Sequence, residues 1–298
     1  MIIVDYSQVS ISTLMAELKG HTDVEINVPL VRHMIVNALR SYKVRFGAEY
    51  GQMIICCDGR RYWRKSVFPQ YKASRKKNRD ASGFDWQSIF EALNLVKTEI
   101  DQFFPYPLVE VDGAEADDVI ASLVYWTQAN DFAEAIGLSD PAPQKVMILS
   151  GDHDFQQLQK FENVTQYAPI EKKYINCKLN PESTLMEHII RGDRGDGIPN
   201  FLSDDDCFVT GTRQKPIRET SVEKWRDMKP EEFITNPTHL RNFERNRTLV
   251  DLSKIPSEIQ ESIVQNYQTQ KGVRNASQLL NYMIQNGMKN LIEHLTEF

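Results

Sequence analysis

The chain has 298 residues, of which 41% are hydrophobic and 26% are charged, and its formal net charge is −6 at pH 7. This composition is typical of a folded protein with a substantial core, and it excludes collagen-like, disordered and low-complexity chains. No apolar run approaches the roughly 18 residues that span a bilayer, and the N-terminus lacks the features of a secretory signal, so we expect a cytoplasmic protein without a membrane contact. The four cysteines have neither a disulfide-framework spacing nor a zinc-site spacing, which agrees with this location.

Short apolar runs rich in branched residues predict strands over residues 2–4, 53–57, 108–111, 146–149 and 164–167. Apolar residues at helical spacing predict helices between them, over 31–44, 86–100 and 116–127. Strands that alternate with helices indicate an α/β fold with a central, mainly parallel sheet and helices on both faces.

After residue 167 the pattern predicts helices alone. Asn180 and Pro181 begin a helix that Gly192 can end. Further helical stretches lie near 203–209, 221–226, 257–267 and 276–294. We therefore expect a catalytic α/β domain over 1–178 and a helical region over 179–298.

One segment is intensely basic. Residues 60–79 contain nine lysines and arginines and no acid, in a chain that is acidic overall. Tyr62, Trp63, Phe68 and Tyr71 interleave with these cations, which is the pattern of a groove for single-stranded nucleic acid, where cations follow phosphates and rings stack on bases. The alternative is a solvated charge run.

Carboxylates follow the predicted strands. Asp5 and Asp58 come directly after the first two, and the remaining candidates are Glu115, Asp117, Asp118, Asp152, Asp154, Asp193 and Asp196. Because the C-terminal ends of parallel strands converge on one crevice, we expect the acids of the sheet to meet there. Taken singly, each could be an ordinary turn or cap residue.

A cluster this dense requires cations, because two carboxylates about 4 Å apart repel by roughly 4 kcal/mol at an effective dielectric of 20. The donors are hard oxygens, which favours Mg²⁺, with Mn²⁺ as a substitute, over zinc. Two such ions can clamp the attacking and leaving oxygens of a phosphoryl displacement. His153 lies between two of these acids, and strand-like alternation would turn it away from them, so we expect it to be structural.

The ordered motifs Asp5, Asp58 with the basic strip, Glu115-Ala-Asp117-Asp118, Ser150-Gly-Asp152-His-Asp154 and Gly192-Asp193-Arg-Gly-Asp196 resemble the flap endonuclease / 5′-nuclease superfamily. Within it, segments such as Tyr62-Trp63-Arg64 and the ending Glu297-Phe298 are similar to the bacteriophage ribonucleases H. The resemblance covers nearly the whole chain.

The resemblance implies a PIN-like 5′-nuclease fold with a flexible arch at 60–85 and a C-terminal helix-three-turn-helix motif that holds duplex. It also implies a two-magnesium site made by the nine acids named above, with Asp58 and Asp152 central to catalysis and Lys72 and Arg75 positioning the scissile phosphate. The expected contacts with nucleic acid are Arg61, Tyr62, Arg64, Lys65, Tyr71, Lys72, Arg75, Lys76, Lys77, Arg79, Arg194, Arg213 and Lys215.

The implied function is a Mg²⁺-dependent 5′-to-3′ exonuclease and flap endonuclease that removes RNA primers and adjoining DNA from lagging-strand fragments in phage replication, in the cytoplasm of the infected host. Its substrates would be DNA and RNA–DNA duplexes with 5′ ends or flaps, acted on by a monomer. Phage single-stranded DNA-binding protein is a candidate partner, and an interaction with the sliding clamp stays open. Pro199 removes a backbone donor from the turn, which argues against a potassium site there.

Two rival functions use the same residues differently. A single-strand-specific PIN-type ribonuclease or a metal phosphatase could use similar acids, but would leave the basic strip and the 192–197 turn without a role. A non-catalytic protein that binds branched DNA would be expected to have lost some of the acids.

Overall fold

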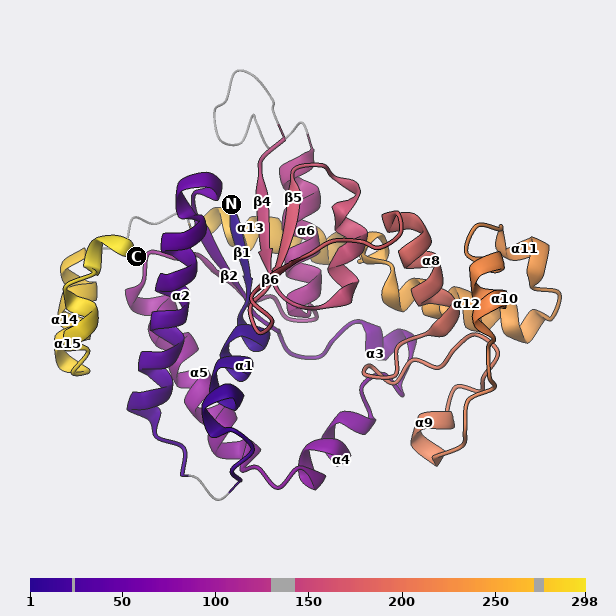
Figure 1. The fold of residues 1–298 in the computed structure, drawn as a ribbon, viewed down its shortest axis with the longest axis horizontal. Coiled ribbons are helices and arrows are strands. Elements are labelled where there is room, and N and C mark those ends of the chain that lie inside the picture. Colours follow the sequence, from indigo (N-terminus) through magenta and orange to yellow (C-terminus); the bar gives the residue numbers. More distant parts are fainter. Residues whose placement is uncertain (23–24, 130–142, 271–275) are drawn as a thin grey trace.

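The computed structural model describes residues 1–22, 25–129, 143–270 and 276–298, and its centre is one six-stranded sheet (Figure 1). The strands are β1 (Ile2–Asp5), β2 (Met53–Cys56), β3 (Leu108–Val109), β4 (Val146–Leu149), β5 (Val164–Ala168) and β6 (Lys173–Ile175), in the order β3-β2-β1-β4-β5-β6. All neighbouring pairs are parallel except β5 and β6, which are antiparallel. The expectation of a mainly parallel sheet is confirmed.

Helices cover both faces of the sheet (Figure 1). Ile2 and Val4 of β1 face the layer of α1 (Tyr6–Leu18), α2 (Val28–Tyr50) and α5 (Trp86–Phe103). Ile3 faces the opposite layer, made by α6 (Ala116–Gln128), the 3₁₀ helix η1 (His153–Lys160) and α13 (Ser257–Thr269). Because successive strand residues point to opposite faces, a continuous apolar run is buried on both sides.

The segment from β6 onward builds a second, smaller core. It contains α8 (Pro181–Arg191), α9 (Cys207–Thr210), α10 (Glu219–Trp225), α11 (Pro230–Phe233) and α12 (Pro237–Val250), and then η2 (Leu252–Lys254). Ile190, Phe201 and Phe243 lie at its centre and are at most 2% exposed. This core places α8 and its following turn beside the C-terminal edge of the sheet.

The last helices return to the α/β layers. α13 packs on α6, and α14 (Ala276–Gln285), α15 (Lys289–Ile292) and η3 (Leu295–Glu297) pack near α5 and α2. Tyr282 of α14 stacks on Phe103 of α5, with ring centroids 4.7 Å apart. A division of the chain near residue 178 stays a prediction, because the C-terminal helices share the core of the N-terminal half.

The basic strip forms two short helices, α3 (Arg64–Val67) and α4 (Ser74–Ala81), between β2 and α5 (Figure 1).

Three local expectations were wrong. His153 begins a 3₁₀ helix rather than continuing a strand, β6 interrupts the region expected to contain helices alone, and the 276–294 helix breaks at Gly287, whose φ is +66°. In the part of the chain that the structure describes, no helix is both long and apolar enough to cross a membrane.

Candidate metal centre and nucleic-acid interface

Acids from four separate segments line one pocket at the C-terminal edge of the sheet. Asp5 follows β1, Asp58 follows β2, Asp117 lies in the first turn of α6 and Asp152 follows β4. The pocket has a volume of about 410 Å³ and is also lined by Lys72. The structure thus brings together the strand-end acids that the sequence separates by up to 147 positions.

Local hydrogen bonds fix the first two carboxylates. Asp5 caps α1 by accepting from the backbone N–H of Gln8 at 3.0 Å, and its other oxygen accepts from Ser150 Oγ at 3.1 Å. Asp58 accepts from Ser7 Oγ at 2.8 Å and from the backbone N–H of Ala116 at 3.0 Å. Each acid is therefore held in place by an element that follows a different strand.

The carboxyl pKa values record how tightly these charges are packed. Burial, with a contribution from Asp58, raises the pKa of Asp5 to about 6, although hydrogen bonds from Gln8 and Ser150 oppose the change. Burial and the neighbouring Asp154 raise the pKa of Asp152 to about 7. Burial and Asp152 raise the pKa of Asp117 well above its usual value. The pocket concentrates more negative charge than its own cations offset.

Glu115 and Asp196 join the pocket to the arch. Lys72 Nζ forms an ion pair with Glu115, and it lies 3.4 Å from Asp196 Oδ2. The hydroxyl of Tyr71 donates to Asp196 Oδ2 at 2.7 Å and lies 2.9 Å from Glu115 Oε2. Arg75 forms a further ion pair with Asp196. Two arch cations, Lys72 and Arg75, therefore lie among the acids and form ion pairs with them.

Asp118 points into the protein. Its Oδ2 accepts hydrogen bonds from Arg64 Nη1 at 2.9 Å and from Trp63 Nε1 at 3.1 Å, and its Oδ1 forms an ion pair with Arg64 Nη2 at 2.8 Å. The side chain of Asp118 is 0% exposed and that of Arg64 is 4% exposed. In the structure Asp118 and Arg64 therefore pair with each other inside the protein. This differs from the expected roles of Asp118 at a metal and of Arg64 on a nucleic acid strand.

Tyr71 differs from expectation in the same way. It is 2% exposed, and its ring packs in a cluster with Phe68 and Ile198. Its hydroxyl is bound to the two carboxylates already described, so its ring offers no face on which a base can stack.

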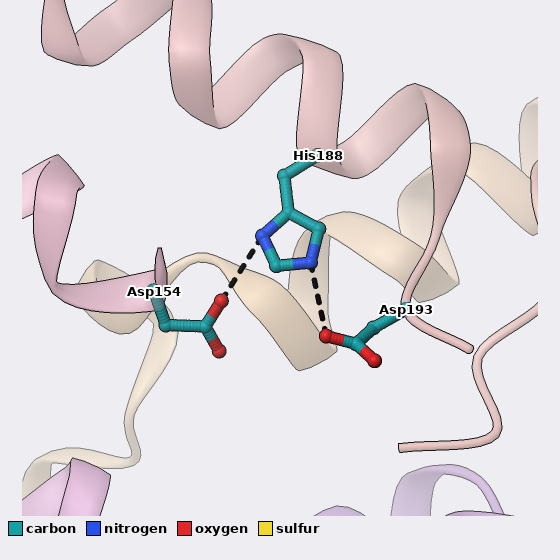
Figure 2. A group of neighbouring side chains, drawn as sticks. All are labelled: Asp154, His188 and Asp193. Atoms are coloured by element: carbon teal, nitrogen blue, oxygen red, sulfur yellow. Dashed lines mark hydrogen bonds and ion pairs between the residues drawn. The ribbon is translucent and has the colours of Figure 1, made fainter. Parts of the chain in front are cut away.

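Asp154 and Asp193 are bridged by His188 of α8, as Figure 2 shows. Nδ1 lies 3.0 Å from Asp154 Oδ1, and Nε2 lies 3.3 Å from Asp193 Oδ2. These ligand atoms lie close enough together to hold a metal ion. Sequence reasoning missed His188, and the signal that could have found it is its place in the last turn of a helix, five residues before Asp193.

The electrostatics of this bridge are strong. Burial disfavours the imidazolium, but the two carboxylates outweigh it and raise the pKa of His188 well above its usual value. Burial opposes the ionised form of Asp193, but hydrogen bonds from His188 and from backbone N–H groups lower its pKa to about 2. The three side chains form a charged unit beside the pocket.

The remaining expected interface residues lie on two surfaces. On the arch, Arg61, Lys65, Arg75, Lys76 and Lys77 are exposed, Tyr62 and Arg79 are half-buried, and Arg61 forms an ion pair with Asp112. Beside α8, a second pocket of about 600 Å³ is lined by Arg191 and by the expected residues Arg194, Arg213 and Lys215. The acid-lined pocket shares Lys72 and Arg75 with the arch, whereas the second pocket has a separate lining.

The donor set fits divalent metal ions. The pocket presents hard carboxylate oxygens, and the raised pKa values of Asp5 and Asp152 show that their negative charge is poorly compensated by protein groups. A bound divalent ion would stabilise the ionised forms that burial disfavours.

A mainly parallel sheet with acids gathered at the C-terminal ends of its parallel strands, beside a cationic arch, defines a metal-dependent nuclease. The model of the 5′-3′ exonuclease N-terminal resolvase-like domain matches residues 3–187, and that of the T4 RNase H C-terminal domain matches residues 180–298. The chain belongs to the 5′-3′ exonuclease family.

Two individual nucleases are similar to this chain in sequence. The chain is 29% identical to the ribonuclease H of Enterobacteria phage T4 over 99% of this chain and 95% of that protein. It is 28% identical to a 5′-3′ exonuclease of Buchnera aphidicola over 56% of this chain and 52% of that protein.

Solved structures share the fold. The phage T5 5′-exonuclease with bound divalent zinc ions matches with a TM-score of 0.58 at 17% identity, over 92% of this chain and 99% of that one. The phage T5 flap endonuclease in a complex with DNA and metal ions matches with a TM-score of 0.56 at 15% identity, over 91% and 98% of the two chains.

Proposed function

We propose that this chain is a Mg²⁺-dependent 5′-to-3′ exonuclease and flap endonuclease that removes RNA primers and adjoining DNA from lagging-strand fragments in phage DNA replication. The observation that carries this proposal is the pocket in which Asp5, Asp58, Asp117 and Asp152 meet the arch cation Lys72. Hard oxygen donors favour Mg²⁺, with Mn²⁺ as a substitute. The T4 relative is a ribonuclease H, and the T5 flap endonuclease was solved with DNA.

In this proposal the pocket acids Asp5, Asp58, Asp117 and Asp152 would hold one ion. Glu115 lies beside this site, where it forms an ion pair with Lys72. Asp154, Asp193 and Asp196 serve a second ion, in part through water. Bound divalent ions would lower the pKa of the attacking water and offset negative charge on the phosphate. The protein orients these acids through the caps and hydrogen bonds of Asp5 and Asp58.

Lys72 and Arg75 would contact the scissile phosphate. Both line the acid pocket, and both now pair with carboxylates that lie beside it. A phosphate group bound in the pocket would offer them an alternative partner of the same charge, with geometry suited to arginine. Their role is to position the substrate next to the acids.

The exposed arch surface and the pocket beside α8 would bind different parts of the substrate. The exposed arch residues Lys65, Lys76 and Lys77 would follow the single strand, and Arg194, Arg213 and Lys215 would contact duplex phosphates. Binding at both places requires a junction between duplex and single strand, which is what a 5′ flap provides.

A magnesium titration of cleavage tests this function. The substrates are a 5′-labelled flap duplex, an RNA-primed duplex, single-stranded RNA and a small phosphomonoester. We expect Mg²⁺-dependent release of short 5′ products from the two duplexes, and little turnover of the other two. Efficient cleavage of single-stranded RNA or of the monoester alone would support the rival functions instead.

A further inference from the structure

A fully buried glutamine contacts the loop that carries Asp152. Gln166 of β5 is 0% exposed, and in the register of the sheet it pairs with Ile148 of β4 and with Ile175 of β6. A polar group inside an apolar sheet is costly unless its hydrogen-bonding atoms have partners. The partners of this amide therefore indicate its role.

Both hydrogens of the Gln166 amide are directed to one loop. Nε2 donates to the carbonyl of Ser150 at 2.9 Å and to the carbonyl of Asp152 at 2.6 Å. Oε1 accepts from Nε2 of Gln159, a residue of η1, at 3.1 Å. Because a carbonyl can only accept, the two carbonyls fix which end of the amide faces them. We call residues 150–152 the acid loop.

The acid loop places two carboxylates of the pocket. Asp152 belongs to the loop and lines the pocket. The hydroxyl of Ser150, a residue that is 0% exposed, accepts from the backbone N–H of Asp152 at 3.2 Å and donates to Asp5 Oδ2 at 3.1 Å. The backbone N–H of Gly151 donates to Gln8 Oε1 of α1. A shift of the acid loop would therefore move Asp152 and withdraw a donor from Asp5.

We propose that Gln166 is a positioning residue of the metal centre, which fixes the acid loop and thereby holds the carboxylates of Asp152 and Asp5 in place for a divalent ion. Gln166 does not line the pocket, so it acts only through the backbone of the loop. This inference rests on the proposed function, since it assumes that these two acids bind the ion.

Gln157 of η1 gives a matched control. It is 6% exposed, its Nε2 donates to the carbonyl of Val250 at 3.1 Å, and its Oε1 accepts from the backbone N–H of Leu252 at 2.9 Å. It is thus a second buried amide with backbone partners, but these partners lie where α12 meets η2. Methionine is unbranched like glutamine and has no donor, so Gln166→Met and Gln157→Met remove comparable hydrogen bonds from different places.

Calorimetry of Mn²⁺ binding compares the two variants. Groups that orient metal ligands typically contribute about 10- to 100-fold to metal affinity, so we expect Gln166→Met to raise the Kd at least tenfold and Gln157→Met to leave it within threefold. Urea denaturation of both variants shows whether their losses of stability are matched. An unchanged Kd in Gln166→Met, or an equal increase in the two variants, would overturn the proposal.

Hydrogen exchange in EDTA measures the acid loop without metal or turnover. Exchange over residues 149–153, followed by mass spectrometry, should be at least tenfold faster in Gln166→Met than in the unaltered protein, and within threefold of it in Gln157→Met. Equal protection in all three proteins would show that Gln166 does not hold the loop, and would overturn the proposal.

Gln159→Met keeps the test decisive if Gln166→Met is too unstable to purify. This variant removes the donor to Gln166 Oε1 and leaves both bonds to the acid loop, so the Kd for Mn²⁺ should rise at least threefold. An unchanged Kd would contradict the proposal.

The proposed function and this inference can fail separately. Flap cleavage and Mn²⁺ binding by the unaltered protein, with equal Mn²⁺ affinity in Gln166→Met, would overturn this inference alone. Failure of the unaltered protein to bind Mn²⁺ would overturn the proposed function and this inference together.

Discussion

Arg64 and Asp118 form an ion pair of 2.8 Å in which the two side chains are 4% and 0% exposed. Arg64 also donates to the carbonyl of Leu249 at 2.8 Å and to Glu115 at 2.8 Å. One arginine of the basic strip therefore joins the first turn of α6 to the end of α12. The basic strip therefore contains both a buried structural arginine, Arg64, and an exposed cationic surface.

Removing the buried side chain of Arg64 should destabilise the fold. Loss of one partner from a buried ion pair typically costs about 3–5 kcal/mol, because the remaining charge stays buried without a counter-ion. We expect this loss in the free energy of unfolding of Arg64→Ala, measured by urea denaturation. Arg61→Ala is the control, since the Arg61 side chain is 84% exposed and surface changes usually stay within about 0.5 kcal/mol. Equal stability of the two variants would disprove the internal role of Arg64.

The imidazolium of His188 should stabilise the fold in a pH-dependent way. Its pKa in the folded protein is raised by Asp154 and Asp193, so its contribution is complete below the pKa of the unfolded chain, about 6.5, and is lost as the pH rises through the higher folded value. In EDTA, the advantage of the unaltered protein over His188→Gln in urea should shrink as the pH is raised from 6 to 9. An advantage that is constant or grows over this range would show that His188 does not act as a cation.

Metal affinity should depend on pH through Asp5 and Asp152. Their pKa values in the metal-free protein are raised to about 6 and about 7, so ion binding must displace protons below these values. We expect the affinity for Mn²⁺, measured by calorimetry, to rise from pH 5.5 to about 7.5 and then to level off. Proton release, read from buffers of different ionisation enthalpy, should fall in Asp152→Asn. Affinity that does not change with pH would contradict the assignment of these acids.

The exposed arch cations should set the salt dependence of single-strand binding. Each phosphate contact contributes about 0.7 to the slope of log K against log salt on single strands. The double variant Lys76→Ala, Lys77→Ala should therefore reduce the slope by about 1.4, measured by anisotropy at several salt concentrations. Lys289→Ala, an exposed lysine in α15, should leave the slope unchanged. An unchanged slope in the double variant would place the strand elsewhere.

The sheet could be predicted because its strands are short apolar runs buried on both faces, and the acids at their ends follow from the topology of a parallel sheet. β6 was missed because it is a polar edge strand without an apolar pattern. α12 was missed because Asn242 and Asn246 occupy its buried face, where apolar periodicity expects hydrophobic residues. Asn246 is 0% exposed and donates to the carbonyls of Ile189 and Pro199, both at 2.9 Å.

The candidate site was only partly predictable, because its remaining features depend on contacts between distant segments. The nine acids were named from their places after predicted strands and in ordered motifs, but these patterns do not reveal that Arg64 would turn inward to meet Asp118. Nor does it reveal that His188 would meet Asp154, 34 positions earlier in the chain. Such pairs are decided by burial and charge in three dimensions.

The central claim is that the pocket acids hold the ions that cleave phosphodiester bonds, and Asp152→Asn tests it most directly. The measurement is single-turnover cleavage of a 5′-flap duplex in Mg²⁺, with affinity for the duplex measured by anisotropy and with Glu17→Gln, an exposed carboxylate of α1, as the control. We predict that Asp152→Asn abolishes cleavage while its affinity stays within threefold of the unaltered protein. Cleavage by Asp152→Asn at the rate of the control would contradict the account.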